Sequence, residues 1–419
     1  MALDKIRIQG GTPLRGNVPV RGAKNSTLPL MAAAVLVEER TTLRNVPALA
    51  DIDSMARLLE SMGVVCRRDG RCLEMDATAM TSHEAHYDLV RKMRASFFVL
   101  GPLLARFGRA KVSLPGGCAI GTRPVDIHLK GLEALGAKIR IDEGYVIAEG
   151  RLRGANIALD FPSVGATENL MMAAARAEGP TRLTNVAHEP EIVDLAAFLN
   201  QLGARVEGAG SDLIAIEGVP ALTGTDHTVI PDRIEAGTLL LAGVATHGEV
   251  RVEGACAAHL PSFLEKLEAI GAEIAVGEDW VQASALNGLK AVDLITGPFP
   301  GFPTDLQAQT MAVLCLAEGA SVIKETVFEN RFMQVAELRR MGANIEIDGN
   351  SAVVRGVPYL SGAPLMASDL RASAALVIAA LAAERGETVI SRVYHLDRGY
   401  ECIEERLAAL GGTVERIEE

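Results

Sequence analysis

A cysteine lies inside a glycine-rich stretch, LPGGCAIGTRP, which runs from Leu114 to Pro124. Two glycines precede Cys118, and Arg123 follows it five residues later. Glycine opens backbone conformations that other residues avoid, so such a loop can approach a ligand closely or fold over it. The spacing alone leaves two interpretations of the thiol open, a reactive group and an inert buried side chain.

Further polar residues stand directly before six strongly apolar segments. They are Lys24 and Asn25; Arg94; Ser163 to Gly165 with Thr167; Asp232, Arg233 and Glu235; Asp305 and Gln307; and Asp369 and Arg371. If the segments are helices, their first turns present free N–H groups and a partial positive charge, which favour anions. Ser, Thr and Asp are also common N-caps, so their presence at these places fits a capping role as well as an anion-binding role. The cations among them oppose the helix dipole and therefore need an anion or a carboxylate beside them.

The six apolar segments are too apolar all round for surface helices, so we expect them to be inner helices. They span residues 26–39, 94–108, 165–179, 233–248, 305–319 and 370–386.

A leucine phrase that ends in glycine recurs six times, with copies roughly 70 residues apart. It ends at Gly63, Gly136, Gly203, Gly271, Gly342 and Gly411. Each copy predicts the last turn of a helix closed by a left-handed glycine, followed by a strand such as 137–141. We infer an α/β fold of six β/α copies with buried inner helices, grouped as two lobes of three. The expected lobes are 22–231, with the Cys118 loop, and 1–21 with 232–419, and the expected active site is the cleft between them.

Composition excludes several classes of function. A formal net charge of −12 provides no basic stripe for nucleic acid and is repelled by anionic membranes. The six cysteines form no CxxC and no zinc spacing, which indicates no metal and a reducing cytoplasm. The sequence shows no signal peptide, no membrane-length apolar run and no nucleotide-fold glycine fingerprint. We expect a cytoplasmic monomer without a cofactor.

Eight segments resemble the sequence motifs of a known family. They are spread along the whole chain. They are RGAKNSTLP, RKMRASFFVLGPL, SLPGGCAIGTRPVDIHLKGLEALGA, FPSVGATENLMMAA, FPTDLQAQ, FENRFM, DLRASAAL and HLDRGYECIEERL. Together they resemble the enolpyruvyl transferases of the EPSP synthase family, and among these the enzymes that act on UDP-N-acetylglucosamine. The resemblance implies two inside-out α/β barrel lobes. It also implies transfer of the enolpyruvyl group of phosphoenolpyruvate to the sugar 3-hydroxyl, with release of phosphate, as the committed step of peptidoglycan synthesis.

The resemblance also implies residue roles. Cys118 gives a proton to C3 of phosphoenolpyruvate and can carry a covalent adduct, while Asp305 takes the proton of the sugar hydroxyl. Asp369 assists proton transfer or holds arginines. Lys24, Asn25, Arg123, Arg371 and Arg398 surround the phosphate and carboxylate, for which the planar fork of arginine is suited. The nucleotide sugar is held by Arg94, by Arg123, Pro124, Val125, Asp126 and Ile127, by Ser163, Val164 and Gly165, and by Val327.

One departure and two alternatives stay open. Phe161 stands where some members place a lysine near the diphosphate, which concerns nucleotide affinity. A sibling enzyme that acts on shikimate 3-phosphate shares the chemistry but not the PGGC thiol. A noncatalytic sugar-nucleotide-binding protein would have lost residues such as Cys118 or Asp305, which this chain keeps. Because the thiol is present, we expect sensitivity to thiol-alkylating fosfomycin.

Overall fold

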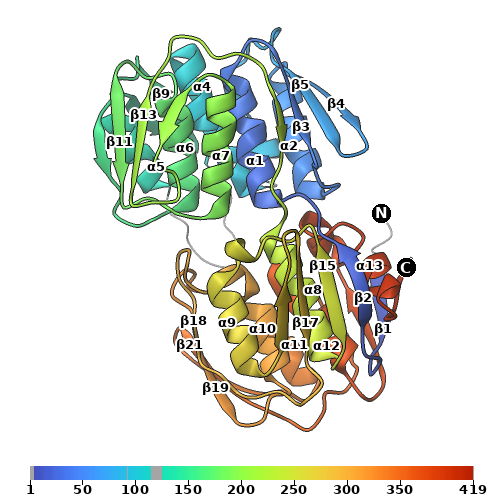
Figure 1. Cartoon of the computed structure of the whole chain (residues 1–419). Helices are drawn as coiled ribbons and strands as arrows, with labels where there is room; N and C mark the ends of the chain where they lie inside the picture. The colour runs from blue at the N-terminus through green and yellow to red at the C-terminus, as the bar shows by residue number, and fades with distance from the viewer. Residues whose placement is uncertain (1–3, 92, 115–124, 419) are drawn as a thin grey trace. The chain divides into compact units, whose positions relative to one another are not determined.

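The computed structural model describes residues 4–91, 93–114 and 125–418. The predicted site residues Cys118, Arg123 and Pro124 lie outside these ranges. The described chain divides into two compact units. We call residues 22–114 with 125–230 the inserted unit, and residues 4–21 with 231–418, which carry both chain ends, the terminal unit. In Figure 1 the inserted unit runs from blue to green, and the terminal unit runs from yellow-green to red, with its N-terminal strands β1 (Lys5–Gln9) and β2 (Arg15–Pro19) in dark blue.

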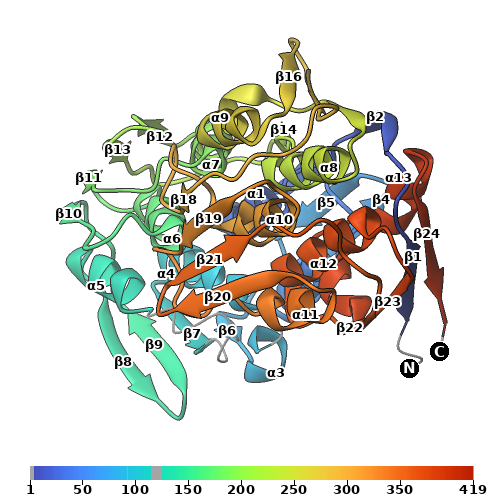
Figure 2. The same ribbon diagram turned by 90° about the horizontal axis from the view of Figure 1, so that it is seen from below.

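The six apolar segments form the inner helices that the sequence predicts. In the inserted unit they are α1 (Lys24–Ala33), continued by a 3₁₀ turn (Ala34–Leu36); a 3₁₀ helix (Arg94–Val99) continued by α4 (Leu100–Phe107); and α6 (Val164–Ala174). In the terminal unit they are α8 (Arg233–Ala245), a 3₁₀ helix (Thr304–Leu306) continued by α10 (Gln307–Leu314), and α12 (Leu370–Ala382). Every residue of α12 after its first is buried. Figure 2 shows α8, α10 and α12 side by side, and these three helices pack against one another.

The described strands form six four-stranded sheets with one shared pattern: an edge strand runs parallel to its neighbour, and the other two pairings are antiparallel. The sheets of the inserted unit are β10 (Asn156–Ala158), β11 (Pro180–Thr184), β13 (Leu213–Glu217) and β12 (Arg205–Glu207); β14 (Asp226–Thr228), β3 (Arg40–Arg44), β5 (Cys72–Asp76) and β4 (Val65–Asp69); and β6 (Glu84–Ala85), β7 (Arg109–Ser113), β9 (Tyr145–Glu149) and β8 (Lys138–Asp142). Those of the terminal unit are β22 (Pro364–Met366), β23 (Glu387–Ser391), β1 (Lys5–Gln9) and β24 (Thr413–Ile417); β16 (Glu273–Val276), β17 (Trp280–Ser284), β15 (Glu249–Glu253) and β2 (Arg15–Pro19); and β18 (Leu294–Ile295), β19 (Ala320–Lys324), β21 (Ser351–Arg355) and β20 (Asn344–Asp348). The repeated pattern supports six copies of one unit.

Strands from distant parts of the chain close each unit. β14, at the end of the inserted unit, runs parallel to β3 near its beginning. In the terminal unit, β1 pairs with β23 and β24 near the end of the chain, and β2 runs parallel to β15. Because these pairings join the first and last copies of each unit, the inner helices are enclosed by sheet and outer helix.

Outer helices end at the predicted glycines. These helices are α2 (Ala50–Ser61), α5 (Asp126–Ala134), α7 (Pro190–Gln201), α9 (Pro261–Ile270), α11 (Gln334–Arg340) and α13 (Ile403–Ala409), and a short α3 (Tyr87–Val90) lies between copies. The glycine that follows each of the six has a φ between 93° and 112°, the left-handed region that glycine adopts without strain. This confirms the predicted caps. Among the described residues no helix has the length and apolarity needed to cross a membrane.

Candidate active site

The inner helices of the terminal unit begin with carboxylates that do different work. Asp232 caps α8, with Oδ1 accepting from the N–H groups of Ile234 and Glu235 at 2.9 and 3.0 Å. Asp369 caps α12 in the same manner, with Oδ1 accepting from the N–H groups of Arg371 and Ala372, both at 3.0 Å. For Asp232 and Asp369 the structure therefore confirms the N-cap interpretation.

Asp305 does not cap a helix, because its carboxylate forms ion pairs with two arginines instead. Its Oδ1 accepts from Arg331 at 2.7 Å and its Oδ2 accepts from Arg371 at 2.8 Å, and both arginines are buried. Burial alone would raise the pKa of the Asp305 carboxyl, but the two guanidinium groups outweigh it and hold the pKa well below the usual range. Asp305 is therefore a firmly ionised carboxylate.

A buried hydroxyl cluster holds Arg371. Its guanidinium donates to the Tyr400 hydroxyl at 3.2 Å, and that oxygen lies 2.9 Å from the Thr238 hydroxyl of α8. The Gln309 amide donates to Tyr400 at 3.1 Å and to the backbone carbonyl of Asp305 at 2.8 Å. These contacts join α8, α10 and α12 directly beside the Asp305 carboxylate.

Arg398 is the last residue of a 3₁₀ helix, Val393–Arg398. Burial lowers the pKa of His395 in the same turn, the positive charge of Arg398 lowers it further, and the negative charge of Asp369 opposes this. The three side chains therefore interact electrostatically. The predicted residues Asp305, Asp369, Arg371 and Arg398 all belong to the terminal unit.

In the inserted unit, another group of predicted residues lies at the start of α1. The ammonium of Lys24, the first residue of α1, lies 2.8 Å from a carboxylate oxygen of Asp51 in α2, and both side chains are buried. This is the carboxylate that a cation at a helix start was expected to need. Asn25 is the next residue of the helix, and Ser26 donates to Asp194 of α7, whose other oxygen lies 2.8 Å from His227.

Some of the residues expected to hold a nucleotide sugar lie near His128 of α5. A Cβ on Gly165 would lie 3.2 Å from Phe98 and 3.5 Å from His128, so the start of α6 is close to α5 and to the end of the Arg94–Val99 helix. Burial lowers the pKa of His128 to about 4, and the nearby charge of Arg94 contributes. The residues that this arrangement positions are Arg94, Val125, Asp126 and Ile127, and Ser163, Val164 and Gly165, with Ser163 as the N-cap of α6.

Glu168 of α6 is a buried carboxyl that the sequence analysis did not single out. Its side chain is 1% exposed, and neither oxygen has a hydrogen-bond partner among the described residues. Burial raises its pKa well above the usual range, and the charges of Glu191 and Glu189 on and before α7 raise it further. The neutral form of this carboxyl is therefore favoured in the folded chain.

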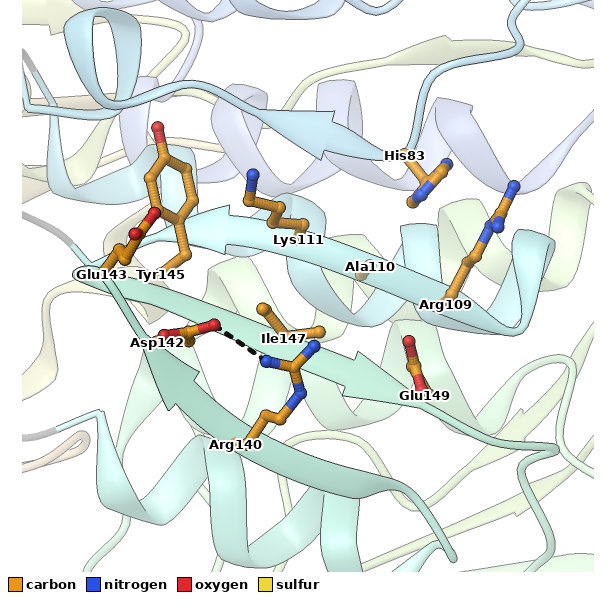
Figure 3. Close-up of a pocket in the computed structure, with 10 residues that line it drawn as sticks. All are labelled: His83, Arg109, Ala110, Lys111, Arg140, Asp142, Glu143, Tyr145, Ile147 and Glu149. Carbon is orange, nitrogen blue, oxygen red and sulfur yellow. Dashed lines mark hydrogen bonds and ion pairs between the residues drawn. The ribbon is translucent and has the colours of Figure 1, made fainter.

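A shallow depression of about 330 Å³ lies elsewhere, on the sheet of β6, β7, β9 and β8 (Figure 3). Several of its charges are paired with neighbours: Lys111 lies 2.7 Å from Glu84 and over the Tyr145 ring, and Arg140 lies 3.0 Å from Asp142. Paired charges of this kind are typical of a solvated sheet face. The residues that line it include none of the predicted site residues.

The described side chains include a carboxylate paired with two buried arginines and a buried lysine paired with a carboxylate. Residues 8–407 match the family model described as EPSP synthase (3-phosphoshikimate 1-carboxyvinyltransferase). The chain belongs to this family. Among curated relatives, two named UDP-N-acetylglucosamine 1-carboxyvinyltransferase come from Rhodospirillum centenum, 57% identical with 100% of both chains covered, and from Anaeromyxobacter dehalogenans, 58% identical with 99% of this chain and 100% of the relative covered.

Solved structures of enolpyruvyl transferases share the fold. The enolpyruvyl transferase NikO of Streptomyces tendae is 27% identical and superimposes with a TM-score of 0.89 over 100% of both chains. An EPSP synthase of Acinetobacter baumannii, 18% identical, superimposes with a TM-score of 0.77 over 99% of this chain and 100% of the other. These matches confirm the fold class that the sequence predicts.

The sequence analysis did not single out Arg331, Tyr400 and Asp51, which contact the predicted residues Asp305, Arg371 and Lys24 respectively. Arg331 and Tyr400 stand inside quoted motifs, FENRFM and HLDRGYECIEERL, but nothing in the motifs says which carboxylate or hydroxyl they contact. Asp51 lies in the first turn of α2, where acidic residues are common for dipole reasons alone. A search for carboxylate partners of the predicted cations could have flagged Asp51.

Proposed function

We propose that this member of the EPSP synthase family transfers the enolpyruvyl group of phosphoenolpyruvate to the 3-hydroxyl of UDP-N-acetylglucosamine and releases phosphate. One observation carries the choice of acceptor. Curated relatives that share 55–58% identity over at least 99% of this chain are named UDP-N-acetylglucosamine 1-carboxyvinyltransferase. Such a reaction would commit sugar nucleotide to peptidoglycan synthesis.

The reaction needs an acid, a base and an anion clamp. C3 of the enol gains a proton, the sugar oxygen attacks C2, and the resulting tetrahedral ketal loses a C3 proton as the C2–O bond to phosphate breaks. We assign the first proton to the Cys118 thiol, which lies outside the described residues. A thiol can also form a covalent adduct at C2.

Asp305 takes the proton of the sugar hydroxyl in this proposal. Each carboxylate oxygen has two lone pairs, so after accepting from Arg331 and Arg371 each oxygen can still accept a hydroxyl proton. The two arginines keep the carboxylate ionised and fix its plane. They also weaken it as a base, so proton transfer is expected to occur with bond formation to C2 rather than before it.

The anion clamp consists of Lys24, Arg371 and Arg398, with Arg123 added from outside the described residues. Lys24 and Arg371 each contact a carboxylate of the protein, Asp51 and Asp305 respectively. A phosphate or carboxylate of the substrate would join these pairs, and charge-assisted hydrogen bonds of this kind are stronger than neutral ones. The clamp would stabilise the phosphate as it leaves.

An acceptor comparison tests the proposal. Purified chain is supplied with phosphoenolpyruvate and either UDP-N-acetylglucosamine or shikimate 3-phosphate, and the product is identified by mass spectrometry. We expect the enolpyruvyl ether of the nucleotide sugar and no product from shikimate 3-phosphate. Turnover of shikimate 3-phosphate alone would assign the sibling activity, and tight binding of the nucleotide sugar without any product would favour a noncatalytic protein.

A further inference from the structure

A second carboxylate, Glu325, lies behind the Asp305 site. It follows β19 directly, its side chain is 2% exposed, and it accepts four hydrogen bonds. Oε1 accepts from the Thr296 hydroxyl at 2.8 Å and from the N–H groups of Val327 and Phe328 at 2.8 and 3.2 Å. Oε2 accepts from the Thr304 hydroxyl at 2.9 Å. One carboxylate thus joins three separate segments of the chain.

Glu325 is connected to Asp305 through the Thr304 hydroxyl and the Arg331 guanidinium. The Thr304 hydroxyl donates to Oε2 of Glu325, so its single proton points at Glu325. The lone pairs of Thr304 then face Arg331, whose Nη1 donates to them at 3.2 Å. The other terminal nitrogen of Arg331, Nη2, donates to Asp305 at 2.7 Å.

Arg331 has few other anchors. Its Nε is buried without a hydrogen-bond acceptor among the described residues, and its guanidinium carbon lies 4.8 Å from the centre of the Phe328 ring. Phe328 is itself held by Glu325 through its backbone N–H. The orientation of Arg331 therefore depends on Glu325 by two routes, the Thr304 hydroxyl and the Phe328 ring.

We propose that Glu325 is a positioning residue for the transferase reaction: through Thr304 it holds Arg331 on the Asp305 carboxylate, and so sets the charge and orientation of the proton acceptor. This inference rests on the proposed function for the role of Asp305. Glu325 also fixes the backbone of Val327, which is expected to face the nucleotide sugar. The same carboxylate thereby links acceptor binding to the basicity of Asp305.

Matched threonine variants separate this role from simple stability. Thr304→Val removes the hydroxyl that lies between Glu325 and Arg331. Thr296→Val removes a hydroxyl of the same kind from the other Glu325 oxygen and leaves the Thr304–Arg331 contact intact. Thr304→Ser restores the hydroxyl. Glu325→Gln keeps an oxygen for the Val327 N–H but places an amide donor opposite Thr304.

The readout is the pH profile of kcat/KM for UDP-N-acetylglucosamine. Thr304→Val and Glu325→Gln are expected to lower kcat about tenfold, the effect of one orienting hydrogen bond. They are also expected to move the acid limb of the profile to higher pH, because Asp305 loses part of the influence of Arg331. Thr296→Val and Thr304→Ser should leave the acid limb in place. A wild-type profile for Thr304→Val, or an equal shift for Thr296→Val, would overturn the inference.

A titration that needs no turnover keeps this test apart from the test of the reaction. The side-chain carbon of Asp305 is followed by ¹³C NMR in aspartate-labelled protein and assigned with Asp305→Asn. We expect Asp305 to protonate at higher pH in Thr304→Val than in the wild type and in Thr296→Val. Identical titrations would reject the positioning role, whereas an inactive wild type with the expected titration shift would reject only the proposed reaction.

Discussion

At the scale of single residues, Asp305 differs from the other carboxylates at helix starts because its side chain leaves the helix uncapped. Asp232 and Asp369 accept from backbone N–H groups through Oδ1, whereas the two oxygens of Asp305 accept from two guanidinium groups. A carboxylate with a purely structural role could stabilise the fold equally well by capping the helix. Placement between two buried cations instead produces a group that stays ionised and retains free lone pairs for a substrate hydroxyl.

Glu168 provides a residue-scale prediction about stability. Its raised pKa means that the folded chain holds a proton that the unfolded chain releases above the ordinary glutamate pKa of about 4.3. Wild-type stability is therefore lost as pH rises from that value toward the folded-state pKa. The neutral replacement Glu168→Gln should raise the melting temperature by a few degrees at pH 8 and by nothing at pH 4. A melting series from pH 4 to pH 8 checks this, and a gain that does not depend on pH would refute it.

Cys118 provides a residue-scale prediction about inhibition. Fosfomycin alkylates thiols, so saturating treatment should abolish sugar-dependent phosphate release by the wild type. The Cys118→Asp variant, with no thiol to alkylate, should keep whatever activity it has after the same treatment. Mass spectrometry should find one added inhibitor on the wild-type peptide that contains residue 118. Full wild-type activity after treatment would contradict the assignment of Cys118 to the reaction.

At the scale of elements, α8 supports the Asp305 turn through a close approach at Gly237. A Cβ at this position would lie 2.5 Å from the side chain of Leu306, the neighbour of Asp305. We predict that Gly237→Ala displaces the Thr304–Leu306 turn and lowers kcat about tenfold or more, since small misplacements of a catalytic group are costly. Steady-state kinetics of the phosphate release reaction measures this.

Gly342 provides the control for that helix variant. It closes α11 with a φ of 97°, and a Cβ there would meet nothing within 4 Å. Gly342→Ala should therefore cost about 1 kcal/mol of stability through backbone strain alone, with kcat unchanged. If Gly237→Ala lost only stability, as Gly342→Ala is expected to do, the support of Asp305 by α8 would be disproved.

The inner helices and the capped outer helices could be predicted from local sequence patterns, but the contacts around Asp305 could not. The all-round apolar segments and the leucine–glycine phrases predict inner helices and capped outer helices because each signal lies within one stretch of sequence. Glu325 lies outside every such signal, since its donors come from Thr296, Thr304 and the 327–328 backbone. The same holds for Arg331 and Asp51, whose partners are far away in sequence or outside the motif.

At the scale of the whole molecule, a chain with a formal net charge of −12 still carries several cations among its candidate site residues. Lys24 and Arg94 belong to the inserted unit, and Arg331, Arg371 and Arg398 belong to the terminal unit. We predict that an anionic nucleotide sugar engages residues of both units and so favours a more compact molecule. Small-angle scattering should show a smaller radius of gyration with UDP-N-acetylglucosamine. An unchanged radius at saturating ligand would count against this.

The central claim is that the chain moves an enolpyruvyl group to a nucleotide sugar with Asp305 as the proton acceptor. The most direct measurement is phosphate release from phosphoenolpyruvate, with and without UDP-N-acetylglucosamine, by the wild type and Asp305→Asn side by side. We predict release that requires the sugar nucleotide and falls about 100-fold or more in the variant, the usual contribution of a general base. Release that ignores the sugar nucleotide, or a variant as fast as the wild type, would contradict the account.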